Sequence, residues 1–138
     1  MTNQIDSCCV LVMGYRQGLC QVLTDLGVAY AVWSENELKS KRKCLHLYVG
    51  RFPRDHHRIC QVLSGFVPFG PFTHVIAGVE AAVYSAAVAR RVLTARTSTQ
   101  SVALRCNDNL HMKTYLHERG IPMTEFMAGN DIHDIAAV

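Results

Sequence analysis

The sequence alternates apolar runs that end at glycine with segments of helical periodicity, and this alternation is the strongest constraint on its fold. The first run, CCVLVMG at residues 8–14, is continuously apolar, which is typical of a strand buried on both faces of a parallel sheet. In residues 15–27, leucine and valine then recur at helical spacing before a terminal glycine. A second strand is expected at residues 28–35. A strand, a helix and a strand in so short a stretch predict a right-handed βαβ unit.

The same alternation continues along the chain. Strands are expected at residues 44–50 and 72–78, and helices at 53–66, with Pro53 near the helix start, and at 79–95. The pattern predicts an α/β fold, a Rossmann-like parallel sheet with helices on both faces. Ligands of such folds bind at the carboxyl ends of the strands. The loops expected at that edge are residues 14–18, 34–37, 50–53 and 78–80.

After a polar linker expected at residues 96–101, a further helix is expected over residues 105–120, leading away from the α/β domain. Asn107 or Asp108 can cap its start, since both side chains accept hydrogen bonds from free backbone amides. Gly120 ends it. Residues 130–138 begin like another helix and stop after about two turns.

Composition narrows the class of protein. The chain has 138 residues, 49% of them hydrophobic, which is enough for one globular domain with a core. The net charge is +3 and the one dense basic run is KSKRK at residues 39–43, so nucleic acid is not an expected partner. A membrane span needs about 20 apolar residues, and no run approaches that length. No signal peptide is visible, and the six cysteines form no CxxC, which favours a reduced, cytoplasmic protein.

The histidines and cysteines raise two further possibilities, a metal site and a catalytic thiol. His56, His57 and Cys60 could bind a metal, with Cys44 and His46 as further ligands, but solvent-facing histidines and a cysteine in the core are the favoured interpretation, so no metal site is expected. Cys8 or Cys9 as a nucleophile is disfavoured, because burial in a strand raises the pKa of a thiol.

The turn after the first strand, GYRQG at residues 14–18, occupies the position where Rossmann proteins hold phosphate. It lacks the GxGxxG pattern, so a dinucleotide-binding protein is a weak interpretation. A tight turn with substrate contact through Arg16 is preferred. Glu80 follows a strand-end glycine and opens a helix, where a carboxylate is either stabilised by the helix dipole or faces a substrate.

Two segments carry a resemblance to a known family. HVIAGVEAAVYSAAVARRVL at residues 74–93, a linker, and LRCNDNLHMKTYLHERGIP at residues 104–122 resemble the ATP-grasp ligases. The similarity is to the amino-acid and peptide ligase branch, near carnosine-synthase-like enzymes and more distantly D-alanine–D-alanine ligase and biotin carboxylase. Order and spacing agree over residues 71–126, whereas the first βαβ units agree only in architecture.

The resemblance implies a pre-ATP-grasp domain at residues 1–102 and the start of an ATP-grasp lobe at residues 103–138. It implies a ligase that activates a small-molecule carboxylate as an acyl phosphate, with ATP and Mg²⁺, before an amine attacks. The glycine-rich lid, adenine hinge and acidic magnesium ligands of the family have no counterpart in these residues. The chain alone is therefore expected to be catalytically incomplete, with no catalytic residue of its own assigned.

The resemblance also implies site residues. Arg105, Asn109 and Lys113 correspond to the family's nucleotide edge, and the family position of Glu80 favours its substrate role. Arg16 is a substrate-binding candidate only from its place in the turn after the first strand. The family's phosphate-binding lysine is Asn109 here, a neutral and shorter side chain that cannot replace an ammonium group. Little or no ATP binding is therefore expected from this chain alone.

Two further expectations concern assembly. Apolar stripes on the helix at residues 105–120 and on residues 131–138 favour a partner, so a homo-oligomer is expected. The alternative function is a non-catalytic α/β interaction or oligomerisation module derived from an ATP-grasp protein.

Overall fold

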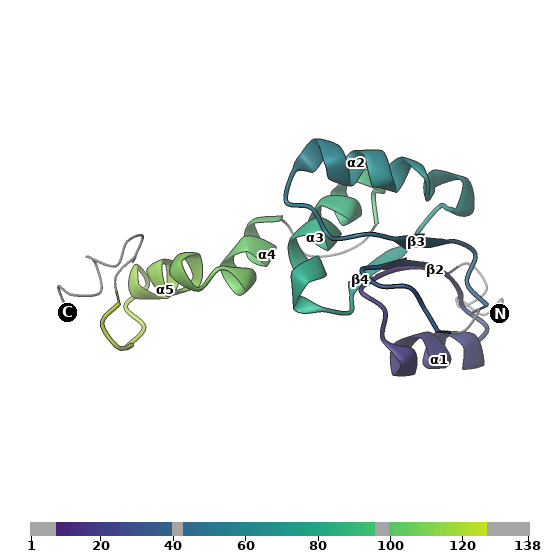
Figure 1. Cartoon of the computed structure of the whole chain (residues 1–138). Coiled ribbons are helices and arrows are strands. Elements are labelled where there is room, and N and C mark those ends of the chain that lie inside the picture. The colour runs from purple at the N-terminus through teal and green to yellow at the C-terminus, as the bar shows by residue number, and fades with distance from the viewer. Residues whose placement is uncertain (1–7, 40–42, 96–99, 127–138) are drawn as a thin grey trace, which may run out of the picture.

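Four parallel strands form one sheet in the computed structural model, which describes residues 8–39, 43–95 and 100–126 (Figure 1). The strands lie in the order β3-β2-β1-β4. Their bounds are Cys9–Met13 for β1, Ala29–Ser34 for β2, Leu47–Val49 for β3 and His74–Ala77 for β4. The expected Rossmann-like α/β fold is confirmed.

Helices cover both faces of the sheet (Figure 1). The first is α1, Gln17–Asp25, the second is α2, His56–Ser64, and the third is α3, Val83–Val92, preceded by a 3-10 turn at Glu80–Ala82. Alternate residues of a strand point to opposite faces, so β1 and β2 serve two cores. One core joins Leu11, Met13, Ala31 and Trp33 to side chains of α2 and α3, and the other joins Val10, Val12, Tyr30 and Val32 to α1.

The start of α2 differs from the expectation. Pro53 lies before the helix, and Asp55 is the N-cap, whose carboxylate accepts a hydrogen bond of 2.8 Å from the Arg58 amide. The short polar side chain of Asp55 provides the better cap because it pairs a free backbone donor. The carbonyl of Pro53 instead accepts a hydrogen bond of 2.7 Å from the buried Ser85 hydroxyl, which ties this loop to α3.

The strand β3 is a short edge strand whose three residues are exposed. It is anchored by the aromatic side chain of Trp33 on β2, which is fully buried. The indole Nε1 donates to the carbonyl of Gly50 over 2.9 Å, and its ring lies 5.4 Å from Tyr48 and 5.3 Å from Phe52, between centroids. Trp33 thereby fixes the loop that follows β3.

Beyond α3, the chain forms an arm that leads away from the sheet (Figure 1). The arm consists of α4, Gln100–Asn107, and α5, Asn109–His117. A single helix over residues 105–120 was the wrong expectation, because Asp108 has an extended backbone and separates the two helices. The expected linker at residues 96–101 is also partly wrong, since Gln100 and Ser101 belong to α4; residues 96–99 and the helix expected at 130–138 lie outside the described residues.

The expected division between residues 102 and 103 falls inside α4. α4 packs against α3, whereas none of the described residues of α5 is buried. None of the helices in the described ranges is long and apolar enough to cross a membrane.

Candidate functional site at the carboxyl edge of the sheet

Three glycines mark the carboxyl edge of the sheet. Hydrogen bonding continues beyond each strand, because the amide of Gly14 donates to Trp33, that of Gly50 to Ser34 and that of Gly78 to Met13, over 2.7–2.8 Å. Since the strands are parallel, the loops after them meet along one edge. The edge expected to hold a ligand therefore has a fixed backbone.

The chain reverses direction across the sheet between β1 and β4, which makes this the switch point where ligands of open α/β sheets bind. The two loops approach each other very closely here. A Cβ added to Gly78 would lie 2.1 Å from the Gly14 carbonyl oxygen, and one added to Gly14 would lie 2.4 Å from Val79. Gly14 also has a φ of 90°, which disfavours other residues. Only glycine allows this backbone contact at both positions.

Arg16 spans the switch point. It is exposed, and its Nε donates to the carbonyl of Gly78 over 2.9 Å. This bond orients the guanidinium group between the two loops and leaves its Nη atoms without a hydrogen bond inside the described ranges. A planar group held in this way can present two parallel donors to a carboxylate.

Glu80 lies on the other side of the same switch point. It is exposed and begins the 3-10 turn that leads into α3, two residues after Gly78. The structure therefore brings the two sequence-predicted substrate residues, Arg16 and Glu80, to adjacent loops. Their opposite charges suit a ligand that carries both a carboxylate and an amine.

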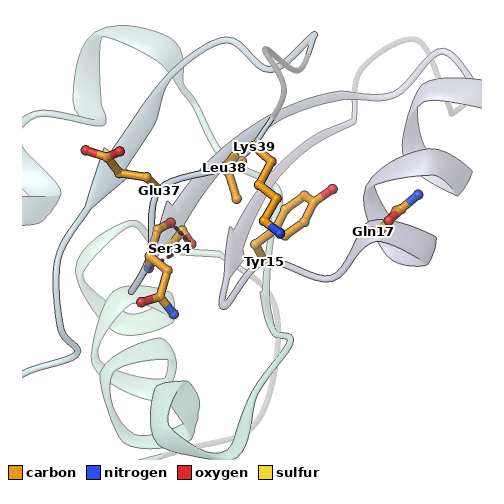
Figure 2. Close-up of a pocket in the computed structure, with 7 residues that line it drawn as sticks. Tyr15, Gln17, Ser34, Glu37, Leu38 and Lys39 are labelled. Atoms are coloured by element: carbon orange, nitrogen blue, oxygen red, sulfur yellow. Dashed lines mark hydrogen bonds between the residues drawn. The ribbon is translucent and has the colours of Figure 1, made fainter.

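A pocket of about 280 Å³ lies one strand away, at the ends of β1 and β2 (Figure 2). Its walls combine a phenol, two amides, a hydroxyl, an acid and a base. Figure 2 shows the Lys39 side chain extending toward Tyr15, whereas the Glu37 carboxylate points away from it. The lining residues are Tyr15, Gln17, Ser34, Asn36, Glu37, Leu38 and Lys39.

Sequence reasoning identified the loop at residues 34–37 but selected none of its side chains. The available signal was the run of polar residues directly after a buried strand. The loop is shaped locally, since the buried Ser34 hydroxyl donates to the Asn36 carbonyl over 2.7 Å. Such a turn carries the polar side chains of residues 36–39 to the carboxyl edge.

The three residues expected at a nucleotide edge lie on two different helices, Arg105 on α4 and both Asn109 and Lys113 on α5. Arg105 lies in the last turn of α4 rather than at the start of α5, and its guanidinium lies 4.1 Å from the centre of the Tyr115 ring. The ammonium of Lys113 lies 5.8 Å from the centre of the Phe126 ring. Asn109 is the first residue of α5. A second pocket, of about 350 Å³, includes Arg105 but neither Asn109 nor Lys113.

The backbone amides at the start of α5 are already bonded to a carboxylate of the chain itself. The Asp108 carboxylate accepts hydrogen bonds from the amides of Leu110 at 2.9 Å and His111 at 3.1 Å, and it lies 3.1 Å from the His111 ring nitrogen. The hydrogen bond from the His111 amide, followed by the one from its side chain, lowers the pKa of Asp108. The Asp108 carboxylate disfavours a phosphate group at this position for two reasons. It already accepts hydrogen bonds from the backbone amides that a phosphate would need, and its negative charge repels the phosphate.

The histidines and cysteines do not form a metal centre in the ranges that the structure describes, where no three His, Cys, Asp or Glu side chains are grouped for that purpose. His56 and His57 are exposed on α2, and Cys60 is half-buried. His46 lies between aromatic rings, 4.7 Å from Phe69 and 5.0 Å from Phe66 between centroids.

Comparison with known proteins shows a similarity in fold to solved structures. No family model matches the sequence, and no curated protein matches it. Among solved structures, the crystal structure of an L-amino acid ligase from Bacillus licheniformis matches 92% of this chain with a TM-score of 0.76 and 16% sequence identity. The chain spans 34% of the length of that protein. The match places this chain in the fold class of one segment of a ligase.

Proposed function

We propose that this chain is the N-terminal, pre-ATP-grasp part of an ATP-dependent carboxylate–amine ligase that acts on amino acids or peptides through an acyl phosphate. The observation that carries the proposal is the fold shared with an L-amino acid ligase over 92% of the chain. The motifs at residues 71–126 support it independently. The narrower, carnosine-synthase-like assignment rests on these motifs alone.

In this proposal, the carboxyl edge of the sheet faces the substrates. The guanidinium of Arg16, oriented by the Gly78 carbonyl, binds the carboxylate of an amino acid. Glu80, on the adjoining loop, attracts the amino group. The described residues of this chain therefore bind and orient substrate, and none of them is assigned a catalytic step.

ATP and Mg²⁺ do not fit the residues that the resemblance assigns to them here. Asp108 occupies the amides at the start of α5, Arg105 packs on Tyr115, and Lys113 lies beside Phe126. The proposed ligase therefore needs residues outside this chain to bind the nucleotide. The chain alone is proposed to be inactive.

We expect this 138-residue chain to bind MgATP weakly or not at all. A favourable charge at one exposed helix terminus contributes about 0.3–1 kcal/mol, whereas micromolar binding needs about −8 kcal/mol. Isothermal titration of MgATP into the chain should give no saturable heat at micromolar concentrations. A stoichiometric isotherm would contradict the account, and repeating it with Arg105→Ala and Lys113→Ala would show whether the site lies on the arm.

The ligase proposal is tested with the complete reading frame that contains this chain. We expect phosphate release from ATP that depends on added amino acids, and Arg16→Ala should raise the KM for the carboxylate substrate. A hydrogen bond to a charged group contributes about 1.5–3 kcal/mol, which corresponds to roughly a 10- to 150-fold change. Arg91→Ala, an exposed arginine at the end of α3, is the matched control and should leave KM unchanged.

Two outcomes would contradict parts of this proposal. One is a complete reading frame that ends at Val138 and releases no phosphate, which would favour the non-catalytic interaction module. The other is amino-acid-dependent activity that Arg16→Ala and Arg91→Ala alter equally, which would remove the substrate role of Arg16.

We also propose that the chain forms a homo-oligomer through its arm. No described residue of α5 is buried, and Leu110 on α5 has an exposed fraction of 43%, as Ile121 just beyond the arm has one of 45%. Exposed apolar side chains of this kind favour association. Light scattering should give a mass above that of one chain at micromolar concentration, and Leu110→Lys should lower it; a constant monomer mass across the concentration range would exclude the oligomer.

A further inference from the structure

The amino edge of the sheet, opposite the proposed substrate site, holds a thiol beside an imidazole. Cys8 immediately precedes β1, and His74 begins β4, the strand that pairs with β1. The Cys8 Sγ lies 3.7 Å from His74 Nδ1, which is hydrogen-bond distance for sulfur. Both residues are half-buried, so part of each remains accessible among the described residues. The sheet register therefore joins two reactive groups that are 66 positions apart in the sequence.

Thr73 fixes the geometry of this pair. Its Oγ1 accepts a hydrogen bond of 3.1 Å from the Cys9 amide and lies 3.0 Å from the Cys9 carbonyl, so the hydroxyl is held on the first residue of β1. The same oxygen lies 3.5 Å from Cys8 Sγ and 3.0 Å from His74 Nδ1. The Cys8 sulfur thus has an imidazole nitrogen within reach as a proton acceptor, and the Thr73 hydroxyl can donate its one proton to the sulfur only when it does not donate to the Cys9 carbonyl.

Cys9 provides an internal contrast. Its Sγ donates to the carbonyl of Phe69 over 3.7 Å, and burial, with a smaller contribution from neighbouring Cys8, raises its pKa. The sequence-based expectation that burial suppresses the thiols therefore applies to Cys9. Cys8 differs from Cys9 in its partner, because its sulfur lies beside an imidazole nitrogen rather than a backbone carbonyl.

We propose that Cys8 is a site of reversible thiol modification by small-molecule disulfides, with His74 as its proton acceptor. In the reaction, the Cys8 thiol proton moves to His74 Nδ1, and the thiolate attacks one sulfur of the disulfide. A mixed disulfide forms on Cys8, the S–S bond of the reagent breaks, and its second half leaves as a thiolate that takes up a proton. The modification is independent of the proposed ligase activity.

The test is the pH dependence of iodoacetamide alkylation, followed residue by residue by mass spectrometry. Cys106, exposed on α4, is the reference. A thiol with an ordinary pKa of about 8.5 loses roughly 25-fold in rate from pH 9 to pH 7. We expect Cys8 to lose less than about threefold over this range, as thiols paired with imidazole do. His74→Gln, which keeps hydrogen bonding but cannot hold the proton, should restore the steep loss.

Oxidised glutathione should then add to Cys8 before Cys106, and dithiothreitol should reverse the addition. Cys8→Ser and Cys9→Ser assign the modified residue, since one peptide carries both. The proposal is overturned if Cys8 follows the same pH dependence as Cys106 in the unmodified chain, a comparison that needs no variant to fold. It is also overturned if glutathione adds first to Cys9 or Cys106, or if His74→Gln leaves the Cys8 profile unchanged.

Discussion

Gly78→Ala is expected to destabilise the fold by at least about 3 kcal/mol, because a new methyl group would meet backbone that has no room to move. The added Cβ would lie 2.1 Å from the Gly14 carbonyl oxygen. Gly14 is itself held by its hydrogen bond to Trp33 in the centre of the sheet. The alanine side chain can therefore be accommodated only if β1 and β4 move apart at the switch point. Arg16 bonds to the Gly78 carbonyl at this point, so its position should change as well.

Urea unfolding followed by circular dichroism measures this effect, with Gly18→Ala as the matched control. A Cβ at Gly18 meets nothing within 4 Å, and the residue lies in α1. Alanine there should cause no loss and a gain of up to about 1 kcal/mol. Equal stability of the two variants would contradict the close contact between the loops after β1 and β4.

Trp33→Ala should cost about 3–5 kcal/mol, the range for removal of a large buried aromatic side chain. Trp33 has an exposed fraction of 0% and is among the largest fully buried side chains of the described core. Its removal leaves a cavity beside Phe66, whose ring lies 6.4 Å away between centroids, and also leaves the Gly50 carbonyl without its indole donor. The loop after β3 should loosen together with the core.

Trp33→Phe separates these two effects in the same urea experiment. Phenylalanine keeps most of the packing but cannot donate to Gly50, so it should cost clearly less than alanine. A Trp33→Ala loss below about 1 kcal/mol would show that the side chain does not hold β2 and α2 together as described.

The central strands β1 and β2 could be predicted from the sequence because the signal is local, whereas β3, expected over residues 44–50, is only the exposed Leu47–Val49. The strands within residues 8–14 and 28–35 are buried on both faces, and the lack of alternation between apolar and polar residues in them indicates this burial. The helix α2 was also predictable on its core face, since Ile59 and Leu63 have exposed fractions of 0% and 1%. The spacing of apolar residues is sufficient to predict a helix or strand where the burial of each residue depends only on the helix or strand that contains it.

The errors arise where a residue's role depends on a distant segment. The carbonyl of Pro53 pairs with Ser85, 32 positions away, and nothing near the proline in the sequence indicates this bond. In the arm, Arg105 was assigned to the start of a helix, whereas it lies in the last turn of α4, because the sequence pattern does not show that a separate helix ends at Asn107. The pocket at residues 34–39 depends on how the side chains of the loops after β1 and β2 lie relative to one another, which periodicity does not show.

The most direct measurement of the proposed function follows oxygen atoms. The complete protein is given ATP and an amino acid whose carboxylate carries ¹⁸O, and the released phosphate is analysed by mass spectrometry. A carboxylate activated as an acyl phosphate transfers one of its oxygens to phosphorus, and attack by the amine then releases phosphate that keeps this oxygen. The account predicts one ¹⁸O in each phosphate released during ligation. Phosphate without the label, or label found in a nucleotide instead, would contradict it.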